Sequence, residues 1–568
     1  ATMGDSPQSY ELKRKDTVSY FTASDEASAM KKQKLSGLKP IDPFCVPLLT
    51  DFYQLSMSYA YWKNKMHEKY AVFDLFFRKS PFEGEFTVFA GLEECVRFIS
   101  DFHFTPSQIA FLRTVLPAQE EEYWTWLAGI NCSKVKVYAL KEGTVCFPRV
   151  PLLRVEGPLA IVQLLETPLL TMVNYPSLIA TNAARIRLAV GPEKTLLEFG
   201  CRRAQGPNGA VSASRYSCMG GFDGTSNVLA GQLFRLTLKG THAHSYVTSF
   251  SPEVKLPEQF IACATDPARK EDLLALSVKY RDECGFTSCN KGELLAFVAY
   301  ALAFPAGFLC LVDTYDTLNS GIPNFLSVAL ALHECGYKAQ GIRLDSGDLA
   351  YLSKEARALF RRTGERYGID YFAAFTIVAS NDLNEKTILS LFQQKHEIDV
   401  FGVGTHLVTC QAQPALGAVF KLVQIEDQPR IKLSEEVSKV SLPGKKLACR
   451  LYDKAGIPIF DVLHIEGRET PQAGKKFLVR HPFNQQKRAY VTPSRVEALH
   501  HVVWDGEVRM AMPTLPEIKA YALSQLQAMR TDHLRPLNPT PYKVSVTTEL
   551  YDFIVELWMR EQPVPEFK

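Results

Sequence analysis

The sequence predicts an α/β protein in which a barrel-like α/β domain packs on an α+β domain formed by the N- and C-terminal segments. Two observations lead to this fold class. Between about residues 160 and 410, apolar strand-like runs alternate with helical stretches, whereas strands and helices mix without strict alternation on either side. Repeated β–α units of this length are typical of a parallel sheet that closes, or nearly closes, into a barrel. A chain of 568 residues is also too long for a single hydrophobic core.

These patterns divide the chain into four segments. They are a disordered tail at 1–40, an N-terminal α+β domain at 41–158, the barrel-like catalytic domain at 159–410, and a C-terminal segment at 411–568 that packs on the N-terminal domain. The tail is predicted to be disordered because it is rich in Ser, Lys, Asp and Glu and has no periodic apolar pattern.

The N-terminal domain is predicted to open with a helix. Thr50 is the expected N-cap, and Leu55, Tyr59 and Trp62 follow at helical spacing. Strands are then expected at 70–77, 135–138 and 145–147, and the C-terminal segment should contribute strands at 419–425 and 429–433 and a helix at 515–529.

The barrel-like region is predicted to contain apolar strands separated by helices. We expect strands at 196–199, 308–312, 339–344, 374–379 and 400–403, and helices at 322–335, 349–361 and 385–394. The stretch from Leu294 to Val312 has no charged residue and approaches the length of a membrane span. Pro305-Ala306-Gly307 interrupts it, so we interpret it as a buried helix followed by a buried parallel strand.

Composition argues for a soluble cytosolic protein that does not bind nucleic acid or membranes. Lys and Arg total 64 against 61 Asp and Glu, so a small anionic substrate must be held by a few placed cations. The 13 cysteines include no C-x-x-C pair, which favours reduced, buried thiols over disulfides or a zinc site. The beginning of the chain has no apolar signal-peptide core.

Polar residues follow the predicted barrel strands at six places. These strand ends are Gly200 to Arg203, Thr241 to Ser245, Asp313 to Asp316, Arg343 to Asp348, Ser380 to Asp382, and Gly402 to Thr405. Ligands of α/β barrels bind at the carboxyl ends of the strands. Each group alone could be a loop ion pair or a tight turn, but six in one periodic array favour a binding site.

The residue types at these strand ends suit a phosphorylated sugar. The run Gly402-Val403-Gly404-Thr405 offers backbone N–H groups to a phosphate, although the motif alone is a weak signal. Arg202 and Arg203 could bind a pyrophosphate with paired hydrogen bonds. Carboxylates that could hold ribose hydroxyls or a magnesium ion are those of Asp313, Asp316, Asp345 and Asp348.

His244 is the most reactive candidate residue. A single histidine is usually structural, but this one lies in Gly240-Thr241-His242-Ala243-His244-Ser245, among the predicted carboxylates and phosphate site. In that setting an imidazole can act as a nucleophile or carry a proton.

The same motifs resemble those of the nicotinate phosphoribosyltransferase family. The motifs that carry the resemblance, over roughly residues 45–430, are Leu48-Leu49-Thr50-Asp51-Phe52-Tyr53-Gln54, Thr181-Asn182-Ala183-Ala184-Arg185, Arg202-Arg203-Ala204-Gln205-Gly206, the run from Gly240 to Phe250, Val312-Asp313-Thr314-Tyr315, Arg343-Leu344-Asp345-Ser346-Gly347-Asp348 and Gly402-Val403-Gly404-Thr405. Their joint occurrence is highly specific.

The resemblance implies a type II phosphoribosyltransferase fold and a homodimer with active sites shared between subunits. It further implies an ATP-dependent condensation of nicotinate with 5-phosphoribosyl 1-pyrophosphate to nicotinate mononucleotide and pyrophosphate, the first step of NAD synthesis from nicotinate. ATP is then a co-substrate and Mg²⁺ (or Mn²⁺) the expected cofactor, with its protein ligands left open.

The resemblance and the chemistry of the strand ends together give a candidate site. His244 matches the histidine that ATP phosphorylates in this family, and Asp313 is the second expected catalytic residue. Residues expected to contact nicotinate are Tyr53 (from the neighbouring subunit), Phe199, Thr241 and Arg343. Residues expected to contact phosphoribosyl pyrophosphate are Arg202, Ser245, Asp345, Asn381, Gly402, Gly404 and Thr405.

Two other functions remain open at this point. A nicotinamide phosphoribosyltransferase would need an acceptor, typically a carboxylate near the substrate loop, for the amide N–H of its substrate. Here Thr241 is followed by His242 and Ala243, which favours the acid substrate. A catalytically silent phosphosugar-binding homologue is the second alternative, since a fold does not guarantee activity.

Overall fold

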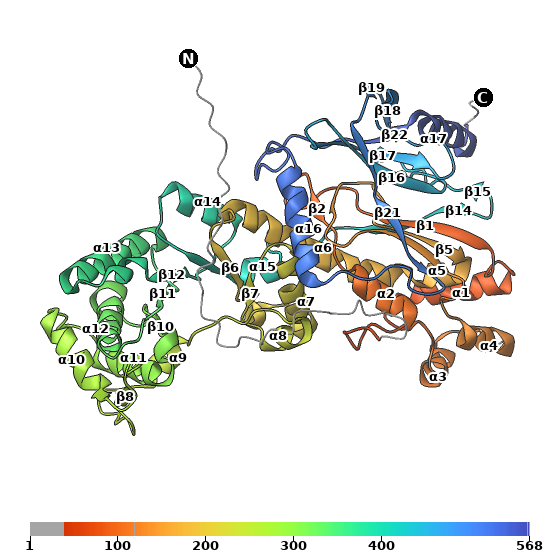
Figure 1. The fold of residues 1–568 in the computed structure, drawn as a ribbon. Helices are drawn as coiled ribbons and strands as arrows, with labels where there is room; N and C mark the ends of the chain where they lie inside the picture. The colour runs from red at the N-terminus through yellow and green to blue at the C-terminus, as the bar shows by residue number, and fades with distance from the viewer. Residues whose placement is uncertain (1–38, 119, 565, 567–568) are drawn as a thin grey trace, which may run out of the picture. The chain divides into compact units, whose positions relative to one another are not determined.

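The computed structural model describes residues 39–118, 120–564 and 566. Nearly all of the tail predicted at 1–40 therefore lies outside the described residues. The described chain divides into two compact units (Figure 1). The smaller unit comprises Lys239–Ala379 with Lys395–Asp399, and the larger unit comprises the chain up to Leu238, Ser380–Gln394 and the chain from Val400 onward.

The smaller unit is built on three short parallel strands. β10 (Leu309–Leu311) pairs with β11 (Gly341–Leu344), which pairs with β12 (Thr376–Ala379). The residues at matching positions, Cys310, Ile342 and Ile377, are fully buried. Figure 1 shows the helices of this unit grouped with these strands. They are α9 (His244–Thr248), α10 (Leu273–Glu283), α11 (Lys291–Ala303), α12 (Ile322–Glu334) and α13 (Leu349–Tyr367). The unit also contains a small hairpin of β8 (Phe260–Ala262) and β9 (Lys270–Asp272).

The stretch from Leu294 to Val312 forms a helix and then a strand, as predicted. Helix α11 ends at Ala303, just before Pro305, and β10 follows. The helix predicted at 349–361 runs on to Tyr367, where Gly368 adopts a φ of +70° that only glycine accepts without strain. Among the described residues, no helix is both long enough and apolar enough to cross a bilayer.

The larger unit also contains three parallel strands. β6 (Thr195–Glu198) lies between β13 (Val400–Val403) and β7 (Gly224–Thr225). The helices that accompany them in the sequence are α5 (Leu159–Leu164), α6 (Glu166–Val190), α7 (Gly206–Met219), α8 (Val228–Phe234), α14 (Glu385–Gln393) and α15 (Thr405–Val408). The parallel strands predicted in both units are present, each shorter than or equal to its predicted length.

An antiparallel sheet in the larger unit joins the two ends of the chain. Its strand order is β15-β14-β1-β5-β3-β21, with bounds of Gln428–Pro429, Val419–Ile425, Tyr70–Phe76, Leu153–Pro158, Lys136–Leu140 and His500–Asp505. β14 pairs with β1 and β21 pairs with β3, so the C-terminal segment lies on the N-terminal one. The domain boundaries predicted at 158 and 410 stay a prediction.

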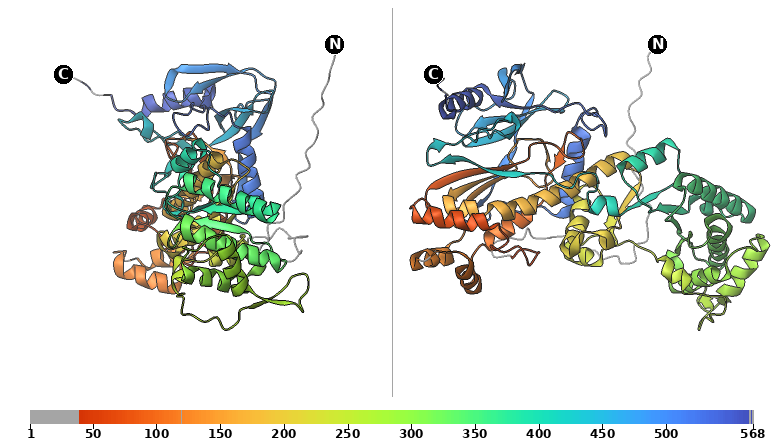
Figure 2. Two further views of the ribbon diagram at one scale, coloured as in Figure 1. Left: turned by 90° about the vertical axis from the view of Figure 1, so that its left-hand side faces the viewer. Right: turned by 180° about the vertical axis from the view of Figure 1, so that it is seen from behind.

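A second antiparallel sheet is built from C-terminal residues alone. Its order is β19-β18-β22-β17-β16-β20, with bounds of Asn484–Val491, Phe477–His481, Val544–Thr547, Pro458–Ile465, Lys446–Tyr452 and Arg495–Ala498. Helix α17 (Thr548–Glu561) packs on this sheet, as Figure 2 shows from two sides. Helix α16 (Leu515–Ala528) matches the helix predicted at 515–529 and begins with a capping box between Thr514 and Glu517.

Two local expectations are wrong. Helix α1 (Phe52–Lys63) begins one residue later than predicted, with Asp51 as its N-cap instead of Thr50. The Asp51 carboxylate accepts a hydrogen bond from Thr167 Oγ1 at 2.9 Å, so a tertiary contact determines this position. The strand expected at 429–433 is reduced to Gln428–Pro429, because Pro429 has no N–H to continue a ladder.

The remaining elements precede α5. They are β2 (Thr87–Val88), α2 (Leu92–Ser100), α3 (Pro106–Val115), α4 (Glu121–Gly129) and β4 (Val145–Cys146).

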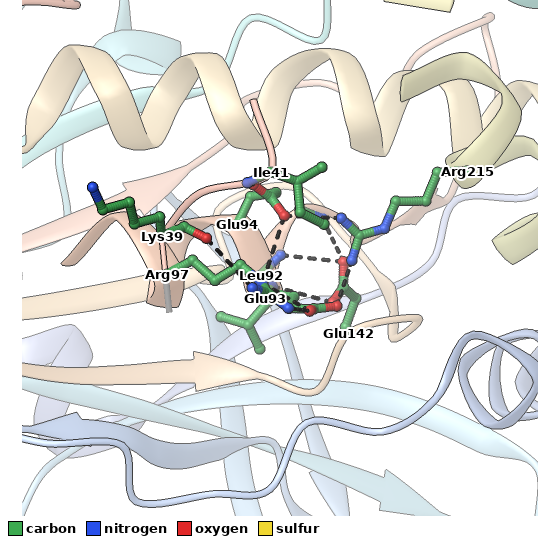
Figure 3. Close-up of polar contacts among 9 residues, drawn as sticks. Lys39, Ile41, Leu92, Glu93, Glu94, Arg97, Glu142 and Arg215 are labelled. Atoms are coloured by element: carbon green, nitrogen blue, oxygen red, sulfur yellow. Dashed lines mark hydrogen bonds and ion pairs between the residues drawn. The ribbon is translucent and has the colours of Figure 1, made fainter. Parts of the chain in front are cut away.

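A buried network of charges joins α2 to α7 (Figure 3). The Glu142 carboxylate accepts hydrogen bonds from the first backbone N–H groups of α2, at 2.6 Å from Gly91 and 3.2 Å from Leu92. The Arg215 guanidinium of α7 binds Glu93 at 2.5 Å and Glu94 at 3.1 Å. Burial raises the pKa of Glu142, while Arg215 and the N–H groups favour its charged form. The arginine thus compensates for a buried concentration of negative charge.

We predict that Arg215→Met lowers the free energy of unfolding by about 3–5 kcal/mol, because it leaves buried carboxylates without their cation. Urea unfolding followed by tryptophan fluorescence measures this directly, since all five tryptophans belong to the larger unit. The matched control is Arg560→Met, which removes an exposed pair with Glu561 and should cost less than about 1 kcal/mol. Equal effects of the two substitutions would contradict the prediction.

Candidate functional site

His244 lies at the centre of a polar cluster in the smaller unit. It is the first residue of α9, and its Nε2 is 3.8 Å from both Asp313 Oδ1 and Asp345 Oδ2. Its Nδ1 is 3.1 Å from Thr314 Oγ1. Asp313 follows β10 and Asp345 follows β11, so the ends of two neighbouring parallel strands bring the carboxylates together. Both ring nitrogens of His244 therefore face polar groups.

The groups around His244 are buried to different degrees. The side chain of Asp313 is 2% exposed and that of Asp345 is 18% exposed, whereas 42% of the His244 side chain is exposed. Asp313 accepts a short hydrogen bond from Ser346 Oγ, and Asp345 binds Arg343 Nη2 at 3.2 Å. The two carboxylates are held in place, whereas the imidazole stays accessible to solvent. A side chain that takes up a chemical group from a dissolved molecule must be accessible in this way.

The segment before His244 is anchored to the edge strand β10. His242 Nε2 accepts a hydrogen bond from the Leu311 N–H at 3.4 Å, and its ring contacts Tyr246 and Tyr300. Burial, with the nearby charges of Arg343 and His244, lowers the pKa of His242 to about 4, so this ring is neutral at neutral pH. Thr241 beside it is partly buried, and Ser245 is exposed on α9.

Three of these contacts were not anticipated from the sequence: those of Thr314, Ser346 and His242. Thr314 and Ser346 directly follow Asp313 and Asp345 in the sequence. Both hydroxyls, and His242 as well, lie within the strand ends that the sequence singled out, but no role was assigned to them. Their contacts with His244, Asp313 and Leu311 are tertiary, so no local pattern could have identified them.

A second group of predicted site residues comes together in the larger unit. Phe199 follows β6, and its ring lies so close to Gly402 of β13 that a Cβ added there would be 2.4 Å from Phe199 Cδ2. Ser380, next to Asn381, lies against the same glycine. Only glycine leaves room for the ring at this position.

A buried carboxylate shapes the turn that carries Phe199. Glu198 is 1% exposed and accepts hydrogen bonds from the Gly200 N–H, from Ser214 Oγ at 2.7 Å and from Thr225 Oγ1 at 2.5 Å. Three donors on one carboxylate hold it strongly in one orientation. The chain direction after β6 is therefore set by a buried side chain.

The run from Gly402 to Thr405 ends in a single helical turn. Helix α15 comprises only Thr405–Val408, so it contributes little macrodipole. Asn182 of α6 donates to the carbonyls of His406 at 3.0 Å and Leu407 at 3.3 Å, and Tyr175 donates to Val408 at 2.6 Å. The motif that contains Asn182 thus holds the Gly402–Thr405 turn in place.

The other predicted site residues of the larger unit lie on separate elements. Arg202 is exposed in the 3₁₀ turn Cys201–Arg203, next to the exposed Arg203, and Asn381 is half-buried in the bend after β12. Tyr53 lies in the first turn of α1 and is 48% exposed.

No metal site is formed by protein side chains alone within the described part of the chain, where no three His, Cys, Asp or Glu residues gather closely enough to hold an ion. A magnesium ion usually binds through one or two carboxylates together with substrate phosphates. All 13 cysteines are free, and nine of them are buried. Cys201 is exposed, so the prediction of buried thiols is wrong at this position.

Comparisons with known proteins agree along the chain. The N-terminal domain of nicotinate phosphoribosyltransferase matches residues 48–174, the nicotinate phosphoribosyltransferase family matches residues 332–458, and the C-terminal domain of that enzyme matches residues 445–554.

Full-length relatives carry the same name. The nicotinate phosphoribosyltransferase of Dictyostelium discoideum is 56% identical over 99% of this chain and 95% of its own length. Nicotinate phosphoribosyltransferase 2 of Arabidopsis thaliana is 54% identical over 93% of this chain and 97% of its own. The Homo sapiens enzyme is 44% identical over 91% of this chain and 97% of its own.

Solved structures give the same result for the fold. The crystal structure of human nicotinic acid phosphoribosyltransferase superposes with a TM-score of 0.82 and 42% identity, covering 89% of this chain and 99% of that one. This match confirms the predicted type II phosphoribosyltransferase fold. A nicotinate-nucleotide pyrophosphorylase from Pyrococcus furiosus superposes with a TM-score of 0.56 over 85% of this chain and 95% of its own. It is 22% identical, so the match shows a shared fold alone. The chain belongs to the nicotinate phosphoribosyltransferase family.

Proposed function

We propose that this protein joins nicotinate to 5-phosphoribosyl 1-pyrophosphate, giving nicotinate mononucleotide and pyrophosphate, and that ATP drives the reaction through a phosphate carried on His244. The observation that supports this most directly is the position of His244, with its accessible ring between Asp313, Asp345 and Thr314. Family membership supports the two substrates.

The condensation needs positioning and charge stabilisation more than covalent help. The pyridine nitrogen of nicotinate attacks the anomeric carbon of the ribose while the bond to pyrophosphate breaks, through a state with positive charge on the sugar. Fixed negative groups and correct placement of the ring lower such a barrier. We assign the ring to Phe199, Thr241, Arg343 and Tyr53, and the phosphoribosyl pyrophosphate to Arg202, Ser245, Asp345, Asn381 and the run from Gly402 to Thr405.

Arg343 is suited to the carboxylate of nicotinate. A guanidinium has five N–H donors, so it can bind Asp345 and a substrate carboxylate at the same time. The neighbouring His242 is neutral at neutral pH, so it adds no positive charge beside Arg343.

The phosphohistidine step follows from the groups around His244. The γ-phosphoryl group of ATP moves to a ring nitrogen, ADP leaves, and water later takes the phosphoryl group as inorganic phosphate. While it is attached, the phosphoryl group lies near the carboxylates of Asp313 and Asp345, and this repulsion favours its discharge. A Mg²⁺ or Mn²⁺ ion would bind together with the substrate phosphates and would neutralise part of their negative charge.

The proposal extends to the assembly and its location. We propose a homodimer in which Tyr53 of one subunit reaches the site of the other, and a cytosolic enzyme whose thiols stay reduced. We also propose a catalytic domain at 159–410 and a C-terminal segment that completes the N-terminal domain, which the pairing of β14 with β1 supports.

The direct test is mass-resolved product analysis with nicotinate, phosphoribosyl pyrophosphate, Mg²⁺ and ATP. Nicotinate mononucleotide is the expected product. Preference for nicotinamide in a competition assay would instead identify the nicotinamide enzyme. A silent homologue would give no product and would take up no acid-labile phosphate from γ-labelled ATP.

We predict that His244→Ala abolishes the stimulation of product formation by ATP while the protein stays folded. The side chain is partly exposed, so its removal leaves no large cavity. Product yield with and without ATP measures the effect, together with acid-labile label from γ-labelled ATP. His333→Ala, on the last turn of α12, is the control and should retain both signals. Unchanged stimulation in His244→Ala would remove this residue from the mechanism.

We predict that Arg343→Lys weakens nicotinate binding by about 1.5–3 kcal/mol, roughly ten- to a hundredfold in Kd, because lysine keeps the charge but loses the planar fork. Binding of phosphoribosyl pyrophosphate should change less. Isothermal titration with each substrate separates the two effects. Arg361→Lys on the exposed face of α13 is the matched control. Equal losses of affinity for the two substrates would mean that Arg343 binds phosphoribosyl pyrophosphate and not the nicotinate ring.

We predict that mixing Tyr53→Ala with His244→Ala restores activity when the two subunits exchange. Each variant should be inactive alone under ATP-dependent conditions. A mixed dimer rebuilds one intact site of two, so random exchange should give about a quarter of wild-type activity. Native mass spectrometry checks that exchange has occurred. Exchange without recovered activity would mean that Tyr53 serves its own subunit.

A further inference from the structure

Glu293 is a fully buried carboxyl group in the smaller unit, which also contains His244. It lies in the first turn of α11 and is 0% exposed. Its Oε2 accepts hydrogen bonds from Ser320 Oγ at 2.5 Å and from Asn324 Nδ2 at 3.0 Å. Ser320 belongs to the π-helical turn Thr317–Gly321, and Asn324 to the first turn of α12. One carboxyl group therefore connects α11 to both elements that follow Asp313 and Thr314.

Asn290 makes this connection rigid. Asn290 is the N-cap of α11, and its side-chain oxygen accepts a hydrogen bond from the Glu293 N–H at 2.9 Å. Its own N–H donates to Ser320 Oγ at 2.9 Å, and its carbonyl accepts from Asn324 Nδ2 at 3.0 Å. The start of α11 is thus cross-linked by polar contacts to the end of the π-helical turn and to the first turn of α12.

The π-helical turn in turn fixes the segment that carries Asp313. A Cβ added to Gly321 would be 1.8 Å from the Val312 carbonyl oxygen, so the turn packs directly against the residue before Asp313. At its other end Asp316 caps the turn, with Oδ1 accepting from the N–H groups of Leu318 at 3.0 Å and Asn319 at 2.8 Å. Asp313 and Thr314, which face His244, lie between these two fixed points.

We propose that Glu293 is a positioning residue for the site proposed above: it holds the π-helical turn and so keeps Asp313 and Thr314 in place against His244. No contact joins Glu293 to a substrate in this scheme. The inference rests on the proposed function of His244, and it concerns how the partners of that residue are held.

The surroundings of Glu293 favour its neutral, protonated form. Its Oε1 is buried without a hydrogen bond, and so is Asn324 Oδ1. The charged groups that act most strongly on Glu293 are the carboxylates of Asp313 and Asp316, which disfavour its ionised form. Glu293 in turn acts on the thiols of Cys289 and Cys310. A proton on Oε1 supplies a donor, whereas an ionised carboxylate would be a buried charge with no cation among its hydrogen-bond partners Ser320 and Asn324.

The acid–base behaviour agrees with this geometry. Burial raises the pKa of Glu293 to about 7, assisted by Asp313 and Asp316 and opposed by the hydrogen bonds from Ser320 and Asn324. The folded protein therefore keeps a proton that the unfolded chain loses above its ordinary value of 4.5. The contribution of this group to stability falls as the pH rises from that value to about 7. Activity that depends on the neutral form falls as the pH rises through about 7.

The test compares Glu293→Gln with Glu293→Leu. A glutamine carbonyl can accept from Ser320 and Asn324, and its amide N–H replaces the acid proton. Leucine removes both and leaves two buried donors without an acceptor. We expect Glu293→Gln to stay within about threefold of wild-type turnover and Glu293→Leu to lose about tenfold or more, in both product formation and acid-labile labelling from ATP. Glu365→Gln, on the exposed face of α13, is the control for the charge change.

The dependence of turnover on pH distinguishes this positioning role from a merely structural one, which would leave that dependence unchanged. The decline in wild-type turnover near pH 7 should be absent in Glu293→Gln. Thermal unfolding between pH 5 and about pH 8 should show the wild type losing stability relative to Glu293→Gln as the pH rises, since only the wild type titrates. An unchanged decline in Glu293→Gln, or Gln and Leu variants that are folded and equally inactive, would overturn the proposal. Wild-type protein without product or label would refute the proposed function instead.

Discussion

Buried carboxyl groups that accept several hydrogen bonds hold the strand ends of this protein. Glu198 accepts hydrogen bonds from the turn after β6 and from Ser214, and Glu293 accepts one from the π-helical turn that follows β10. Glu142 does the same at the first N–H groups of α2. A carboxyl group has two oxygens and accepts from several donors at once, so one side chain can fix several segments. The short parallel strands set the arrangement of the sheet. The buried carboxyl groups then fix the conformation of the segments that follow.

This construction has an energetic cost that is offset in different ways. Removing a carboxylate from water is unfavourable unless cations, N–H groups or a proton compensate for its charge. Glu142, with Glu93 and Glu94, has the Arg215 guanidinium nearby. Glu198 has three donors and no ion pair with a cation among its hydrogen-bond partners. Glu293 has two donors and negative neighbours, and its neutral form is the one that fits. The same residue type thus plays three electrostatic roles in one chain.

The candidate site separates an accessible reactive group from rigid supports. His244 is 42% exposed, while Asp313 beside it is almost completely buried and is tied to Ser346. In the larger unit the Phe199 ring is held against Gly402, where any side chain would displace it. Preorganised supports of this kind lower a reaction barrier because they do not rearrange during the reaction. The glycine and the buried carboxylates are therefore as much a part of the candidate site as its accessible side chains.

The sequence by itself determined the parallel strands, most of their helices, and the residues at the strand ends. It did so because buried strands are apolar and because the residues that follow them must be polar. Family resemblance added the roles that we propose for His244 and Arg343. Only the tertiary structure decided which groups support them. The contacts from Glu293 to Ser320, from His242 to Leu311 and from Asn182 to His406 join residues far apart in the chain. No local pattern records such pairs, because a buried Glu, His or Asn is chosen by the donors and acceptors that folding brings to it.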